Sequence, residues 1–237
     1  MTRIVVGVDG SAHAAAALRW AVAEAELRGD RVVAVFAWGY IPPGHAGDGH
    51  TFDAGYTRAA ADAALLAAMH EAVGPDIADG IERRVPCELP PTALLSAATG
   101  ADLLVIGTRG VGGLRGLLLG SVSQACLHHT TGTLAIVRDP GSGGGGADTR
   151  DAQLGVPGGR IVVGIDDSEA AKRALRWALD EARRRKASVD VVHAWRPPYL
   201  GARPFGPSGM DVDAIEARAR AEFDRVVDRE VTGQQPG

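Results

Sequence analysis

Short apolar runs alternate with longer stretches of helical periodicity through the first 140 residues. Residues 4–8 form a continuous apolar run, which is typical of a strand buried on both faces. Apolar residues then recur at helical spacing between Ser11, a potential N-cap, and Gly29, a potential helix end. Further strands are predicted at residues 32–38, 81–87, 103–106 and 133–137, and further helices at 54–73, 91–99 and 121–129. This alternation predicts an α/β fold with a doubly wound, five-stranded parallel sheet.

The apolar pattern of residues 3–38 returns at residues 160–195. At a constant offset of 157, the two segments are identical at 20 of 36 positions, which indicates a duplicated unit. Residues 141–159 between the copies are rich in glycine and polar, as expected of a flexible linker. The sequence therefore predicts a complete domain at residues 1–140, a linker at 141–159 and a second copy at 160–237.

The second copy is expected to be incomplete. The offset places the counterpart of Gly80 at the last residue, before a third strand could form. The copy keeps Asp166 and Ala194, which correspond to Asp9 and Ala37, and a helix is predicted at residues 211–230. Because two strands leave core-facing surface uncovered, we expect this copy to be a poor independent domain.

Composition excludes several classes of protein. Apolar residues make up 46% and charged residues 23%, as in globular proteins, and the net charge of −4 argues against a general nucleic-acid binder. Two cysteines, Cys87 and Cys126, do not make a disulfide scaffold and are expected to be small core residues. The adjacent His128 and His129 lack metal-ligand spacing, and no metal site is predicted. No leader or membrane-length apolar run is recognised, so a cytoplasmic protein without membrane contacts is expected.

A glycine-rich stretch follows the fourth predicted strand and opens a helix. Glycines let the backbone approach phosphate oxygens, and the N-terminus of the helix directs N–H groups at the same anion. Ser121 and Ser123 add hydroxyl donors, and Arg109 and Arg115 could add positive charge. The stretch has no lysine for a Walker A loop, and its glycines do not fit the GxGxxG spacing of a dinucleotide site. Without further information it could also be a flexible surface loop.

The spacing Gly-x2-Gly-x9-Gly-Ser resembles the ATP-binding signature of the universal stress protein family. Gly107, Gly110, Gly120 and Ser121 match it without a shift, and the segments VVGVDGS and ADLLVIGTRG also resemble that family. The resemblance covers residues 1–140, and the duplication is similar to that of tandem members. It implies a Rossmann-like domain, related to adenine nucleotide alpha hydrolases, that binds ATP with Mg2+.

The resemblance also implies roles for individual residues. Asp9 matches an acidic residue beside the adenine, and Ala37 matches a residue that contacts adenine through its backbone. The ribose and phosphate contacts are matched by Gly107, Gly110, Gly120, Ser121 and Val122, to which the properties of the loop itself add Arg109 and Ser123. A purely structural alternative exists for Asp9, which could cap the turn into the first helix.

We expect a regulatory protein of the stress response whose contacts with partners or with other copies depend on bound nucleotide. No catalytic base or nucleophile can be assigned, so at most a weak ATPase is expected. The alternatives are a slow ATPase or adenine-nucleotide hydrolase, and a scaffold protein without nucleotide. The resemblance further implies pairing through the edge of the fifth strand. Because the second copy ends before that strand, we expect a homodimer in which two such edges pair.

Overall fold

The computed structural model describes residues 2–38, 57–110, 118–139, 159–166, 168–194 and 212–232. Contacts between residues divide the chain into two units, Met1–Leu154 and Gly155–Gly237, and each is described by itself. No helix within the described ranges is long and apolar enough to cross a membrane.

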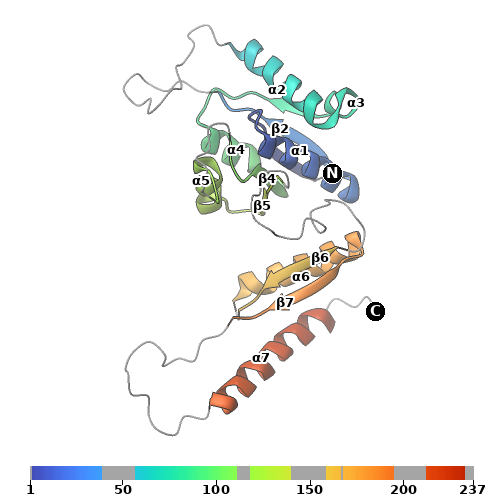
Figure 1. Cartoon of the computed structure of the whole chain (residues 1–237), viewed down its shortest axis with the longest axis vertical. Coiled ribbons are helices and arrows are strands. Elements are labelled where there is room, and N and C mark those ends of the chain that lie inside the picture. Colours follow the sequence, from blue (N-terminus) through green and yellow to red (C-terminus); the bar gives the residue numbers. More distant parts are fainter. Residues whose placement is uncertain are drawn as a thin grey trace, which may run out of the picture. The chain divides into compact units, whose positions relative to one another are not determined.

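The first unit contains a parallel sheet of five strands in the order β3-β2-β1-β4-β5 (Figure 1). This arrangement confirms the predicted doubly wound fold, with the chain running outward from the centre of the sheet in both directions. The strands are β1 (Arg3–Gly7), β2 (Arg31–Val35), β3 (Glu82–Arg84), β4 (Leu103–Gly107) and β5 (Leu134–Val137).

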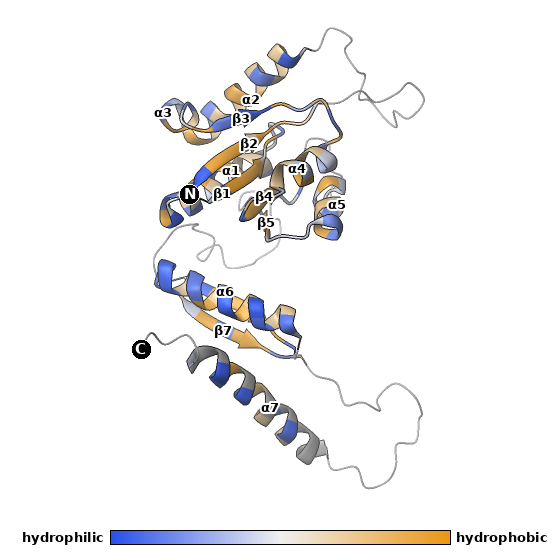
Figure 2. Cartoon of the chain, turned by 180° about the vertical axis from the view of Figure 1, so that it is seen from behind, coloured by the Kyte–Doolittle hydropathy of each residue, from blue (hydrophilic) through white to orange (hydrophobic). Residues whose placement is uncertain are grey.

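Helices cover both faces of this sheet. They are α1 (Ala12–Arg28), α2 (Arg58–Val73), the short α3 (Pro75–Ala78), α4 (Pro90–Ala98) and α5 (Ser121–His129). One buried cluster joins Ile4 and Val6 of β1 to α1 and α2, and a second joins Val5 to α4 and α5. Successive residues of β1 therefore enter different cores, which explains the continuous apolar run. Figure 2 shows the central strands as a hydrophobic layer.

The predicted ends of the first helix are confirmed. The Ser11 side chain accepts a hydrogen bond from the Ala14 N–H, and Gly29 ends α1 in the left-handed conformation at φ 70°. Trp20 packs against the first core cluster, which agrees with a packing role.

Other local predictions need correction. The predicted strand at 81–87 is shortened to three residues in β3, while Trp38 and Cys87 form an isolated parallel bridge. Cys126 is buried as expected, and its burial raises the pKa of the thiol, but Cys87 is exposed. Helix α3 was not predicted. The predicted loop at 39–52 lies outside the described residues, as does the linker apart from Gly159.

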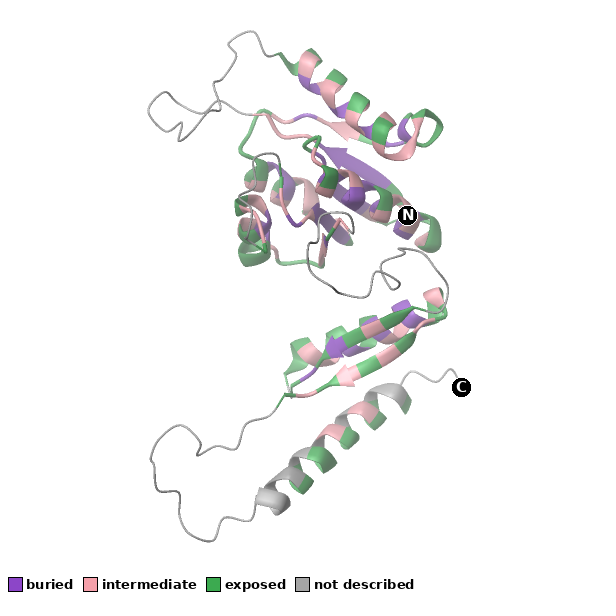
Figure 3. Ribbon diagram, in the orientation of Figure 1, coloured by how far each residue is buried: buried purple, intermediate pink, exposed green. Residues whose placement is uncertain are grey.

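The second unit has a parallel pair of strands, β6 (Arg160–Gly164) and β7 (Ser188–Val192), with helices α6 (Glu169–Arg185) and α7 (Val212–Thr232). Val163, Ile165, Leu175 and Ala178 form its buried cluster, against which Phe223 and Val227 of α7 pack. Side chains on the opposite face of the strands are exposed (Figure 3).

Candidate functional site

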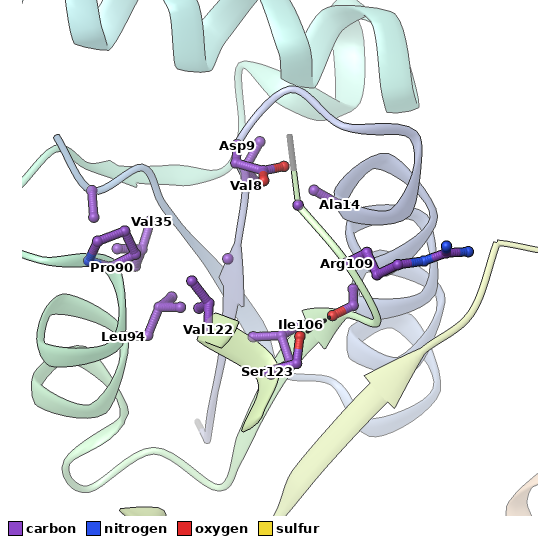
Figure 4. Close-up of a pocket in the computed structure, with 14 residues that line it drawn as sticks. Val8, Asp9, Ala14, Val35, Pro90, Leu94, Ile106, Arg109, Val122 and Ser123 are labelled. Atoms are coloured by element: carbon purple, nitrogen blue, oxygen red, sulfur yellow. Dashed lines mark hydrogen bonds between the residues drawn. The ribbon is translucent and has the colours of Figure 1, made fainter. Parts of the chain in front are cut away.

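A pocket of about 110 Å³ lies at the carboxyl ends of β1, β2 and β4 (Figure 4). This is the edge at which doubly wound sheets bind ligands. Most of its wall is apolar and is drawn from three strands and the starts of α4 and α5. Lining residues are Gly7, Val8, Asp9, Ala14, Val35, Ala37, Pro90, Leu94, Ile106, Gly107, Arg109, Gly110, Val122 and Ser123.

Seven of the nine predicted site residues line this pocket, namely Asp9, Ala37, Gly107, Arg109, Gly110, Val122 and Ser123. The other two, Gly120 and Ser121, lie at the start of α5, whose second and third residues are in the wall. The structure therefore brings the end of β1, the end of β2 and both ends of the glycine-rich stretch to one place.

Asp9 has a structural contact in addition to its place in the pocket. Its Oδ1 accepts a hydrogen bond from the Ser11 N–H at 3.0 Å, so the residue does cap the turn into α1. Its other carboxylate oxygen lies so near Gly110 that a Cβ at that position would collide with it. The carboxylate is therefore held between the turn before α1 and the glycine-rich stretch.

Close packing affects two glycines where the stretch leaves β4, and it requires glycine at residue 107. A Cβ on Gly107 would lie 2.7 Å from the carbonyl carbon of His13, which is closer than carbon atoms approach. A Cβ on Gly110 would meet the carboxylate of Asp9, which would have to move to make room. Gly120, at the other end, has more room, because the nearest atom to a Cβ there is the Arg109 Cα at 3.4 Å. Residues 111–117 lie outside the described ranges.

The N-terminus of α5 opens at this edge without a side-chain cap. Gly120 is its N-cap, and among the described residues no side chain makes a capping hydrogen bond with the first N–H groups of the helix. An anion is a natural partner for such groups. Ser121, the first helical residue, is exposed.

The structure gives Ser123 and Arg109 other contacts than expected. Ser123 is buried, and its hydroxyl donates to the carbonyls of Gly107 at 2.8 Å and Thr108 at 3.1 Å. That hydroxyl therefore holds the ends of the stretch together. Figure 4 shows the Arg109 guanidinium pointing away from the other pocket side chains. Its backbone carbonyl accepts a hydrogen bond from the Ser11 hydroxyl at 3.4 Å.

Several residues of the site were not anticipated from the sequence. Pro90 and Leu94 of α4 form part of the wall, although only their place after the third strand could have indicated it. His13 and Thr108 share a hydrogen bond of 3.2 Å next to lining residues Ala14, Gly107 and Arg109. A signal for His13 existed, because the second copy has Ala170 at the corresponding position.

The second unit repeats only the turn that follows its first strand. Asp166 Oδ1 accepts a hydrogen bond from the Ser168 N–H at 2.9 Å, as Asp9 does from Ser11. Hydrogen bonds from the side chain and backbone of Ser168 lower the pKa of Asp166 from its ordinary value. Neither unit, within the residues described, has a cluster of three or more potential metal ligands.

Comparison with known proteins agrees with the residue pattern. The sequence profile of the universal stress protein family matches residues 1–138 and 159–236. A universal stress protein of Mycolicibacterium smegmatis is 30% identical over 200 residues, which cover 81% of this chain and 63% of that protein. One from Mycobacterium tuberculosis is 30% identical over 226 residues, covering 91% and 70%. The chain thus spans less than two thirds of the first relative's length.

Comparison with solved structures agrees with the fold in one case. A universal stress protein from Archaeoglobus fulgidus DSM 4304 aligns with 94% of this chain and 73% of its own, at 19% identity and a TM-score of 0.51. A universal stress protein solved in complex with cAMP covers 57% of this chain and 96% of its own, at 28% identity and a TM-score of 0.42. On the match of the family profile to both units, this chain belongs to the universal stress protein family.

Proposed function

We propose that the first unit binds ATP, with Mg2+, in the pocket at the ends of β1, β2 and β4. The observation that carries this proposal is the position of Gly107, Gly110 and Gly120 around the open N-terminus of α5. The backbone has close contacts at Gly107 and Gly110, and among the described residues no side chain caps the first N–H groups of α5. Both features favour the triphosphate.

The apolar wall suits the adenine ring. Val35, Leu94, Ile106 and Val122 contribute side chains that can contact the faces of a flat aromatic group. Asp9 adds a polar group at the same wall. The remaining polarity that a base requires has to come from the backbone.

Backbone geometry supports a base contact at Ala37. The N–H groups of Phe36 and Trp38 donate to carbonyls of the β3 segment, at Arg84 and Pro86. Because backbone groups alternate in direction along an extended chain, the N–H and C=O of Ala37 point to the β1 side. On that side the Val8 N–H donates a hydrogen bond to the Val35 carbonyl, and β1 ends at Gly7. The backbone of Ala37 is therefore directed past the end of β1, toward the pocket.

We further propose that the bound nucleotide regulates a protein of the stress response in the cytoplasm, and that hydrolysis is at most slow. Mg2+ would arrive on the phosphate oxygens, its usual ligands in nucleotide sites. The packing at Gly107 and the hydrogen bond from the Gly120 N–H to the Thr108 carbonyl would change when nucleotide binds. Such a change can alter partner or oligomer contacts on the same unit.

The same proposal includes a homodimer through β5. This strand is at one edge of the sheet. The carbonyls of Thr133 and Val137 accept hydrogen bonds from the β4 segment. By alternation, the backbone groups of Leu134 and Ile136 point outward, where a second β5 could pair with them.

The decisive experiment is to purify the full chain gently, denature it and identify the nucleotide that is released. Release of ATP supports the proposal, and titration of the nucleotide-free chain with ATP should then give one site per chain. ADP with steady turnover would indicate an ATPase instead. No released nucleotide, together with no binding in the titration, would leave only the scaffold role.

A further inference from the structure

Thr108 connects three elements around the glycine-rich stretch. It is 8% exposed, and its N–H donates to the Val137 carbonyl in β5 at 3.0 Å. Its own carbonyl accepts from the Gly120 N–H at 2.8 Å and from the Ser123 hydroxyl at 3.1 Å. Its hydroxyl is hydrogen-bonded to Nδ1 of His13 at 3.2 Å. One buried residue thus ties the first turn of α1 and the edge strand to the start of α5.

The first turn of α1, which carries His13, is itself packed and hydrogen-bonded against residues 107–109. The backbone of His13 packs so tightly on the end of β4 that only glycine fits at residue 107. Ser11, which caps α1, also reaches the carbonyl of Arg109. Consecutive residues 107, 108 and 109 therefore all contact the start of α1.

We propose that His13 is a positioning residue for the phosphate loop, defined as the described ends of the glycine-rich stretch, residues 107–110 and 118–120. By holding the Thr108 hydroxyl, His13 fixes the orientation of the Thr108 carbonyl. That carbonyl in turn holds the Gly120 N–H and so places the N-terminus of α5 before the nucleotide arrives. Preorganisation of this kind raises affinity because less order has to be imposed on binding.

The duplication is consistent with this role. The second copy keeps Asp166 and Ser168, the counterparts of Asp9 and Ser11, but has Ala170 where the first has His13. The histidine is thus not needed for the turn itself, which the aspartate and serine form in both units.

The first test rests on the proposed ATP binding and uses calorimetric titration of the full chain with ATP. His13→Ala should weaken binding about five- to tenfold, the value of one buried hydrogen bond. His13→Asn should stay within about twofold of the unmodified chain, because its amide can occupy the place of Nδ1. The double variant His13→Ala with Thr108→Val should be no weaker than the weaker single variant. Additive losses, or an asparagine no better than alanine, would overturn the inference.

A second test needs no ligand. Hydrogen exchange measured by NMR reports the Gly120 amide, with the Gly29 amide, which donates to the Ala25 carbonyl at the far end of α1, as the reference. In His13→Ala, exchange at Gly120 should rise about fivefold while Gly29 is unchanged. Equal acceleration at both, or none at Gly120, would show that His13 does not position the loop. If the unmodified chain fails to bind ATP, the proposed function fails, and this measurement still decides the role of His13.

Discussion

The two copies of the β–α–β segment are alike on the side that faces their first helix. Leu18 of α1 and Leu175 of α6 occupy corresponding positions, and both are fully buried. A buried glutamate one helical turn before an arginine is also repeated, as Glu24 with Arg28 and Glu181 with Arg185. Local sequence is sufficient to reproduce this half of the core, since each strand pair packs on its own helix.

On the other side of the strands the copies differ in how far corresponding residues are buried. Val5 and Val35 are 0% and 1% exposed, whereas their counterparts Val162 and Val192 are 58% and 50% exposed. In the first unit α4 and α5 cover this face, as the second core cluster shows. Burial at these positions is therefore decided by segments distant in sequence, and identical valines can be core or surface.

One substitution follows this difference. Val33, fully buried in the first unit, corresponds to Asp190 in the second. Asp190 is exposed and pairs with Arg160 at 3.2 Å. A carboxylate is stable on a hydrated face and would be costly beneath α4 and α5. At residue 190 this face of β6 and β7 therefore carries a group suited to water, although Val162 and Val192 are exposed on it too.

Two separate substitutions, Val33→Asp and Asp190→Val, should show the largest difference in stability between the units. Val33→Asp should destabilise the first unit by about 3 kcal/mol or more, because it buries a charge without a partner. Asp190→Val should change the stability of the second unit by less than about 0.5 kcal/mol, since either side chain at residue 190 lies at a hydrated surface. Urea unfolding followed by circular dichroism and by NMR signals of each unit measures both. If the two substitutions changed stability equally, residues 33 and 190 would not differ in burial as the structure shows.

The binding site provides the next contrast. Gly120→Glu should weaken ATP binding about 100-fold or more, because it places a negative charge beside the phosphates. Gly120→Ala is the matched control and should cost only a fewfold, since φ −79° is ordinary and the nearest atom to its Cβ is 3.4 Å away.

Asp166→Ala in the second unit should leave the affinity unchanged, and calorimetry should find one site per chain. Two equivalent sites, or a loss with Asp166→Ala, would show that the second unit binds nucleotide too.

Dimer formation through β5 would be a property of the first unit alone, because the second has no such strand among its described residues. Leu134→Pro should shift the proposed dimer toward monomer by about tenfold in dissociation constant, since the lost N–H faces away from β4. Leu134→Ala, which keeps that N–H, is the control for the lost side chain. This control is needed because Leu134, like Ile136, packs against the second core cluster.

Analytical ultracentrifugation measures the change. A monomer for the unmodified chain at high micromolar concentration would rule out the edge contact.

The sequence predicted those features that depend on near neighbours. Ser11, Gly29 and the apolar runs specify caps and strands locally, and strand alternation specifies the parallel sheet. The topology and the family resemblance brought the distant site segments together, but individual side-chain contacts between them were not predictable. The hydroxyl of Ser123 could equally bind a phosphate or a carbonyl, and only the fold shows that Gly107 lies in reach. The exposure of Cys87 and the pairing of His13 with Thr108 have the same origin.

The smallest predicted effect concerns how the first helix of each copy ends. Gly29 and Lys186 occupy corresponding positions, and both adopt the left-handed conformation, at φ 70° and φ 53°. A lysine pays about 1 kcal/mol for this conformation, which glycine adopts freely. Gly29→Lys should therefore destabilise the first unit by about 1 kcal/mol. Lys186→Gly should stabilise the second by somewhat less than 1 kcal/mol, because glycine also gains freedom in the unfolded chain. Lys186→Asn should fall between lysine and glycine, since asparagine tolerates this conformation better than lysine does. Urea unfolding resolves these differences if the NMR signals of each unit are followed separately. A lysine as stable as glycine at residue 186 would mean that the second helix ends in another way in solution, and that the likeness of the two copies stops before their second strands.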